Sequence, residues 1–186
     1  MAVFPSDTVY GVACDAAQGE AVRRLYALKQ RPLEMPSAVM FFSLELALAS
    51  LPELGARSEQ ALCQLLPGGV TLLLDNPAGR FPLACGDQPA TLGLRVPRLG
   101  ESLAALAAIK WPVLQSSANS RGEPAPVEIG KLEERIRDGV DLVLDAGPLS
   151  GSSSTIVDLR GYESQGSWSV LREGPVGVDE LRGILG

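Results

Sequence analysis

The apolar residues of this chain come in short runs, and this shortness limits the folds that it can adopt. Residues 70–74 and 103–109 form the longest of these runs, and both fall far below the ~20 residues that a membrane-spanning helix needs. Short runs of this kind are typical of strands buried in a sheet. With 186 residues, the chain is long enough for one domain with a substantial core and short for two.

Segments with a helical spacing of apolar residues alternate with strand-like runs along the chain. Helices are predicted for residues 16–28, 44–51, 56–66, 103–109 and 129–137. Strands are predicted for residues 2–4, 38–42, 70–74, 91–96, 112–114, 142–144, 155–159 and 168–171. This alternation predicts an α/β fold, with helices flanking an open, twisted and mixed β-sheet.

The composition excludes several kinds of chemistry. The chain has no histidine, so the commonest general base and metal ligand are missing, and Ser-His-Asp and Cys-His catalysis are excluded. The three cysteines, Cys14, Cys63 and Cys85, are odd in number and form no CxxC pair. They predict neither a disulfide framework nor a zinc site, and we expect them to be buried or half-buried thiols.

The net charge of −6 and the pI of about 4.7 argue against a protein that coats nucleic acid, because such proteins are normally basic. An anionic ligand would therefore have to meet a local basic site. The N-terminus has no basic region followed by a long apolar stretch, so no secretory signal is predicted and a cytoplasmic location is expected.

The first residues form a polar, turn-rich segment, Phe-Pro-Ser-Asp-Thr-Val-Tyr-Gly at positions 4–11. Pro5 fixes φ and Gly11 allows a positive φ, so the segment is predicted to be a loop that holds a ligand. Lys29 and Arg31 follow at the end of a predicted helix. They either complement the helix dipole or form a clamp for a phosphate group.

Other polar positions adjoin predicted strands. Residues 115–122 follow the apolar run 112–114, and residues 151–155 lead into another apolar run; each is either a plain turn or part of a ligand site at a strand end. Arg95 and Arg172 interrupt apolar runs. A buried arginine is costly unless it meets an anion, so each either binds one or lies at a sheet edge facing water. No P-loop and no GxGxxG fingerprint occurs in the sequence.

Taken in order, seven blocks of the sequence resemble the threonylcarbamoyl-AMP synthase family, the YrdC-like domain. The blocks are Pro-Ser-Asp-Thr-Val-Tyr-Gly, Lys-x-Arg-Pro, Pro-Gly-Gly-Val-Thr-Leu, Leu-Arg-Val-Pro, Ser-Ala-Asn, Ser-Thr-Ile-Val-Asp and Leu-Arg-Glu-Gly, and they extend from about residue 3 to about residue 176. The resemblance implies a single YrdC-like domain over residues 1–186, with a large, concave and positively charged cavity. The chain begins almost at the first block, without the helix that usually precedes it in the family.

The resemblance also implies an activity, that of a nucleotidyltransferase. L-Threonine, bicarbonate or CO₂, and ATP would give threonylcarbamoyl-AMP and pyrophosphate. A partner transferase complex would then use the product to modify tRNA to threonylcarbamoyladenosine. ATP is implied as a substrate, together with Mg²⁺ held mainly by the phosphates and water. No metal site made by the protein and no membrane is implied.

Site residues are implied by the positions that match the family's motifs. Those implied to bind threonine are Ser6, which stands where the family usually has Thr, Arg95 and Ser154. Those implied to bind ATP are Lys29, Arg31, Thr91, Ser117, Asn119 and Arg172. Lys29 and Arg31 would face the phosphates and serve as the catalytic cations.

Two other functions stay open at this point. The first is a non-catalytic module that binds tRNA or double-stranded RNA, which the acidic pI disfavours. The second is a carbamoyl-transfer enzyme resembling the related domain of hydrogenase maturation proteins. That domain normally lies in a much larger chain, beside zinc-finger and acylphosphatase parts that this sequence does not contain.

Overall fold

The computed structural model describes residues 1–149 and 151–186. Its strands are β1 (Ala2–Pro5), β2 (Tyr10–Asp15), β3 (Ala38–Met40), β4 (Val70–Asp75), β5 (Thr91–Arg95), β6 (Val113–Ser117), β7 (Leu142–Val143), β8 (Thr155–Asp158) and β9 (Ser169–Arg172). Its α-helices are α1 (Gly19–Leu28), α2 (Leu44–Ala49), α3 (Ala56–Leu65), α4 (Pro82–Cys85), α5 (Glu134–Gly139), α6 (Tyr162–Gln165) and α7 (Val178–Leu185), and its 3₁₀ segments are η1 (Glu101–Ala108) and η2 (Ile129–Lys131).

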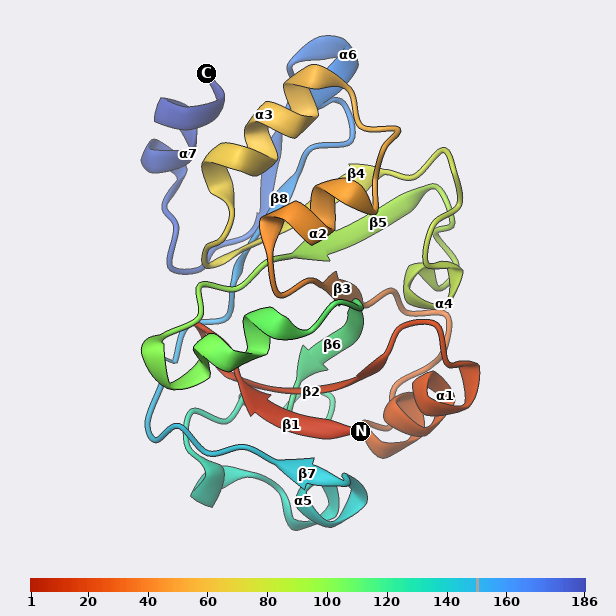
Figure 1. Ribbon diagram of the computed structural model, residues 1–186, viewed down its shortest axis with the longest axis vertical. Helices are drawn as coiled ribbons and strands as arrows, with labels where there is room; N and C mark the ends of the chain where they lie inside the picture. The colour runs from red at the N-terminus through yellow and green to blue at the C-terminus, as the bar shows by residue number, and fades with distance from the viewer. Residues whose placement is uncertain (150) are drawn as a thin grey trace.

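The strands form one nine-stranded sheet in the order β7-β1-β2-β6-β3-β5-β4-β8-β9. Strand β3 pairs parallel with β5, and β4 pairs parallel with β8, whereas β2, β6 and β3 are successively antiparallel. The predicted mixed α/β sheet is therefore confirmed. In Figure 1, β1, β2 and α1 lie in the lower half of the molecule, and β4, β5, α2 and α3 lie in the upper half.

One face of the sheet is covered by helices. Alternate strand residues point to opposite faces, and Val39, Leu72, Leu94 and Leu114 are fully buried in the main hydrophobic cluster. The helices add the side chains that complete this cluster, among them Leu25 of α1, Leu62 of α3 and Leu181 of α7. This face supplies most of the core.

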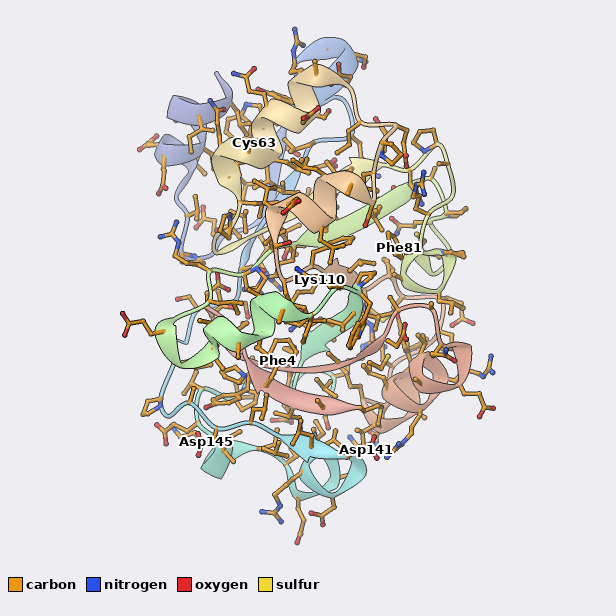
Figure 2. All side chains as sticks on the ribbon, in the orientation of Figure 1. Phe4, Cys63, Phe81, Lys110, Asp141 and Asp145 are labelled. Carbon is orange, nitrogen blue, oxygen red and sulfur yellow. The ribbon has the colours of Figure 1, made fainter. Side chains whose placement is uncertain are left out.

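The opposite face is covered only in part. At one end Phe4, Met40 and Val113 form a smaller cluster, against which Leu106 of the η1 segment and Ile109 just after it pack; Figure 2 labels Phe4 in this region. Beyond this cluster the sheet register sets small residues beside one another. Gln115 of β6 pairs with Ala13 of β2 and with Ala38 of β3, and Ala38 pairs in turn with Gly93 of β5. Small side chains leave this part of the face open.

The polar segment at the start of the chain is a tight hairpin and not the loop that the sequence analysis predicts for all of residues 4–11. Phe4 pairs with Gly11 and Pro5 with Tyr10, so that only residues 6–9 form the turn. Phe4 and Tyr10 are both buried, on opposite faces of the sheet. Burying these aromatic rings favours strand pairing over an open loop.

Three other local predictions need correction. The predicted turn at 115–122 begins too early, because Gln115, Ser116 and Ser117 belong to β6 and pair with β2. The predicted helix at 103–109 is a 3₁₀ segment. The predicted helix at 129–137 is divided into η2 and α5, and the short helices α4, α6 and α7 are not predicted at all. Short and weakly periodic segments depend on tertiary packing that local patterns do not carry.

The cysteines match the prediction in two cases. Cys14 and Cys85 are buried, and burial raises the pKa of the Cys14 thiol to about 11. Cys63, which Figure 2 labels on α3, is exposed, contrary to the prediction. In the described part of the chain, none of the helices has the length and hydropathy that crossing a bilayer requires.

Central-strand packing gives a prediction about stability. Leu94 is fully buried on β5, whereas Leu142 on the edge strand β7 is 52% exposed. We expect Leu94→Ala to lower the free energy of unfolding by about 2–5 kcal/mol, because it leaves a cavity in the core. Leu142→Ala, the matched control, should change it by less than about 1 kcal/mol. Urea unfolding followed by circular dichroism measures both, and equal losses would contradict the assignment of the core.

Candidate active site

A cavity of about 440 Å³ opens on the uncovered face of the sheet. Strands β3, β4, β5, β6, β8 and β9 and the segment after α1 contribute to its wall. Four arginines line it, and its described lining residues include neither aspartate nor glutamate. The arginines are Arg31, Arg95, Arg160 and Arg172.

Arg95 is held by the turn of the β1–β2 hairpin. Its side chain is 4% exposed, and its Nη2 donates to Asp7 Oδ1 and, at 2.7 Å, to Thr8 Oγ1. The other carboxylate oxygen of Asp7 accepts the backbone N–H of Arg98 at 3.0 Å. Burial lowers the pKa of Arg95, and the carboxylate of Asp7 opposes that effect. Arg95 therefore meets the anion that its position in an apolar strand requires.

Arg31 lies just beyond α1 and faces the end of β6. It donates to Ser116 Oγ at 3.4 Å and to the carbonyl of Pro36, and its guanidinium carbon lies 5.7 Å from the centre of the Tyr26 ring. Burial lowers the pKa of Arg31. These contacts direct the guanidinium to the cavity instead of to bulk water.

Two buried donors in this cavity wall are unsatisfied. Among the described residues, the only buried side-chain nitrogens or oxygens without a hydrogen-bond partner are Arg31 Nε and Arg95 Nε. An unsatisfied buried donor costs about 1–3 kcal/mol, and such groups call for an explanation. Both belong to arginines that line one cavity. Because the two Nε atoms are themselves inaccessible, an anionic ligand would have to meet the terminal guanidinium nitrogens.

Arg172 and Ser154 form a second polar group in the wall. Arg172 donates from Nε and Nη2 to the carbonyl of Ser154 at 3.1 and 2.8 Å, and from Nη2 to its hydroxyl at 3.2 Å. Ser154 Oγ lies 2.7 Å from Thr71 Oγ1. Thr71 was not predicted as a site residue. Alternation within the strand, which puts Thr71 on the face opposite Val70 and Leu72, is the signal that could have identified it.

Thr91 lies where the cavity meets a second hollow of about 590 Å³. Arg160, which lines both spaces, donates to Thr91 Oγ1 at 3.4 Å and forms a bidentate pair with Asp158, with distances of 2.9 and 2.6 Å. Arg160 was not predicted as a site residue, since the sequence places it in a polar turn after a strand. Its charge is offset by Asp158, unlike that of Arg172, which has no carboxylate partner in the described chain.

Ser6 lies behind the cavity wall and not in the cavity lining. It is 3% exposed, donates to the carbonyl of Val9 at 2.8 Å and lies 2.9 Å from Thr8 Oγ1. Because Thr8 in turn accepts from Arg95, Ser6 reaches the cavity through two hydrogen bonds.

Lys29 and Asn119 also lie behind the wall. The buried ammonium of Lys29 donates to the backbone carbonyls of Ser117 and Asn119, the latter at 2.8 Å. The side chain of Asn119 accepts from Ser117 Oγ and donates to the carbonyl of Glu123, and it lines a separate hollow of about 470 Å³. Burial lowers the pKa of Lys29 to about 8, and the charge of Arg31 acts in the same direction.

Six of the predicted site residues therefore come together in one cavity lining. They are Arg31, Thr91, Arg95, Ser117, Ser154 and Arg172. Ser6, Lys29 and Asn119 form a layer behind them. The ligand assigned to each residue stays a prediction.

The structure combines an open, mixed α/β sheet with a hollow on one face that four arginines line. Comparison with known proteins identifies the family. The family model Sua5/YciO/YrdC, described as Telomere recombination, matches residues 1–174. This chain belongs to that family, as the sequence analysis predicts.

Named relatives agree with this assignment. Over 191 residues the chain is 35% identical to a Mycobacterium tuberculosis protein that is provisionally named threonylcarbamoyl-AMP synthase, covering 100% of this chain and 83% of that protein. Among solved structures it is similar to Sua5 of Pyrococcus abyssi complexed with L-threonine, with 26% identity and a TM-score of 0.84. Its likeness to Escherichia coli YciO, with 23% identity, a TM-score of 0.77 and coverage of 96% and 85% of the two chains, shows the fold alone.

Coverage of the P. abyssi protein is partial. The structural match covers 100% of this chain but only 53% of the Sua5 chain. The chain thus spans about half the length of that relative.

The buried Lys29 gives a prediction about pH. Because its pKa falls from the ordinary 10.5 to about 8 in the folded state, the unfolded chain binds more protons between these values, so stability should rise with pH there. We expect the free energy of unfolding of the wild type to increase relative to that of Lys29→Met by on the order of 3 kcal/mol between pH 8 and pH 10.5.

Denaturant titrations of both proteins at several pH values measure this difference. Other titrating groups contribute equally to both proteins, so their contribution cancels in the comparison. Lys131→Met, which removes a 62% exposed lysine side chain, is the matched control and should show no such trend. A difference between wild type and Lys29→Met that is independent of pH would rule out a depressed pKa.

Proposed function

We propose that this chain is an L-threonylcarbamoyladenylate synthase, which makes threonylcarbamoyl-AMP and pyrophosphate from L-threonine, bicarbonate or CO₂, and ATP. The observation that carries the proposal is a cavity whose described lining has four arginines and neither aspartate nor glutamate. Membership of the Sua5/YciO/YrdC family and the names of relatives such as the P. abyssi threonylcarbamoyl-AMP synthase support the same activity.

The proposed substrates divide the cavity between them. We assign the carboxylate of threonine to Arg95, with Ser154 and Thr71 as further hydrogen-bonding partners. The phosphates of ATP are assigned to Arg31 and Arg172, and Thr91 and Ser117 would contact the nucleotide. Lys29 and Asn119 would support the nucleotide side from behind by fixing the backbone at the end of β6. We infer that the cavity carries net positive charge, in contrast to the net charge of −6 of the chain.

The proposed reaction needs no histidine. The nitrogen lone pair of threonine forms a bond to the carbon of CO₂, one C=O electron pair moves onto oxygen, and the amine proton goes to solvent. A carbamate oxygen then attacks the α-phosphorus, and the bond to the β-phosphate oxygen breaks to release pyrophosphate. Negative charge is present on phosphate oxygens throughout, so positioning and cationic stabilisation supply the catalysis.

Magnesium would enter with the nucleotide and not through a site of this protein. The described residues contain no group of three or more histidines, cysteines or carboxylates that could hold a metal, and the cavity lining offers arginines and hydroxyls. Mg²⁺ prefers carboxylate, phosphate and water oxygens. These residues therefore do not fit a resident ion, and we assign the protein no step through one.

The proposed product would be used to modify tRNA. Threonylcarbamoyl-AMP is an activated mixed anhydride, so a transferase complex would have to accept the threonylcarbamoyl group and pass it to tRNA. We propose a cytoplasmic location for these steps.

The decisive experiment measures pyrophosphate release. Purified wild-type protein with Mg²⁺ should release pyrophosphate from ATP only when threonine and bicarbonate are both present, and mass spectrometry should detect threonylcarbamoyl-AMP. Omitting each substrate in turn provides the controls. Pyrophosphate release that does not depend on threonine, or no release at all, would refute the proposed function.

A second prediction tests the amino-acid side of the cavity. Arg95→Ala should raise the KM for threonine by about 10- to 100-fold, since hydrogen bonds to a charged group contribute about 1.5–3 kcal/mol. Its KM for ATP should rise less, because the lost Arg95–Asp7 pair loosens the hairpin turn but removes no group assigned to the phosphates. The matched control is Arg24→Ala, which removes an exposed arginine that pairs with Asp141 (labelled in Figure 2). An Arg95→Ala protein that loses affinity for ATP and keeps affinity for threonine would reverse the assignment.

A further inference from the structure

Gln115 is a buried polar residue to which the motifs of the sequence assign no role. It lies on β6, is 5% exposed and lines the cavity. Its side-chain amide makes no hydrogen bond to any described residue. Neither its nitrogen nor its oxygen is among the fully buried side-chain atoms that lack a hydrogen-bond partner, so both are accessible. The amide therefore opens on the cavity with its donors and its acceptor free.

The surrounding chain leaves room for this amide. A Cβ atom on Gly11 would lie 2.2 Å from Gln115 Nε2, which is closer than real Cβ atoms approach, and 3.2 Å from its Cδ, which is a tight contact. Ala13 and Ala38, the partners of Gln115 on the two neighbouring strands, are small as well. The glycine and the alanines let the Gln115 side chain lie along the floor of the cavity.

Gln115 lies between the two arginines that carry unsatisfied donors. Its neighbour Ser116 accepts from Arg31. On the other side, Ala38 pairs with both Gln115 and Gly93, and Arg95 follows Gly93 by two residues on β5. The amide also lies over Gly11, at the end of the hairpin whose turn holds Arg95. It therefore faces the space between the proposed threonine and phosphate positions.

We propose that Gln115 binds the one-carbon reactant, as CO₂ and then as the carbamate formed on threonine. The proposal rests on the function proposed above, in which this carbon links the amino acid to the α-phosphate. A carbamate has one N–H donor and two oxygen acceptors, and a primary amide offers the complementary N–H donors and C=O acceptor. A neutral amide can hold the carbamate without forming an ion pair that would weaken its attack on phosphorus.

The first test is Gln115→Leu, which keeps the volume and removes both polar groups. With ATP and threonine saturating, the KM for bicarbonate should rise about 10-fold, the effect of losing one to two hydrogen bonds. Calorimetry without bicarbonate should give Kd values for threonine and ATP within about twofold of wild type, which also shows that the variant is folded. Gln115→Ala, which adds no apolar bulk, should give the same split.

The second test uses the close contact with Gly11. Gly11→Ala should displace the amide and raise the KM for bicarbonate, and it should add little in a protein that already carries Gln115→Ala, because both changes act on one group. The matched control is Gly183→Ala in α7, where a Cβ would meet no atom within 4 Å. That variant should keep wild-type kinetics.

Each outcome separates the two proposals. A wild type that releases no pyrophosphate overturns the function and this assignment together. An active wild type with an unchanged bicarbonate KM in Gln115→Leu overturns the assignment of Gln115 alone. A weaker Kd for threonine with an unchanged bicarbonate KM would mean that Gln115 contacts the amino acid itself, which also overturns it.

Discussion

The ion pair between Arg95 and Asp7 is the interaction on which the cavity depends. It joins two residues 88 positions apart and brings the turn of the first hairpin against the central strand β5. Taking a guanidinium out of water is costly, and the cost is recovered only when partners satisfy it closely. Asp7 and Thr8 supply these partners, and Asp7 also accepts the N–H of Arg98, so the chain on both sides of the cavity is fixed by a single carboxylate.

The second constraint is the size of the side chains on the two faces of the sheet. On the helix-covered face, large apolar side chains such as Val39, Leu72, Leu94 and Leu114 are fully buried in the main cluster. On the other face the η1 segment reaches only the end marked by Phe4 and Met40, and alanine and glycine occupy the adjoining positions. The cavity therefore exists because the sheet is wider than the segment that covers this face and because its open part carries small residues.

Sequence reasoning went furthest where one residue or one run carried the signal. Most strands were found because they are apolar and short, although β2 (Tyr10–Asp15) was not predicted as a strand. Arg95 and Arg172 were found because a charge inside such a run needs an explanation. Thr71 and Arg160 were missed, and Gln115 was included only as the first residue of the polar segment 115–122 with no role of its own, because their importance arises from sheet register. Gln115 matters because β6 lies between β2 and β3, with Gly11 diagonally opposite, and no local pattern states which strands are neighbours. For the same reason Ser6 matched a motif yet lies behind the wall.

The absence of histidine from the sequence gives the cavity a particular electrostatic character. Its four arginines keep their charge at any pH at which the protein is folded, so the cavity itself has no switch in the neutral range. Behind the wall, burial lowers the pKa of Lys29 to about 8, and its ammonium contacts backbone carbonyls of the β6 end instead of the cavity. A change of pH near neutrality would thus act on the support of Ser117 and Asn119, and on the amine and bicarbonate of the proposed substrates. We infer that such a site selects its ligand by geometry. Its charges do not change with pH, and its hydroxyls and its amide form hydrogen bonds only with a ligand whose polar groups lie in matching positions.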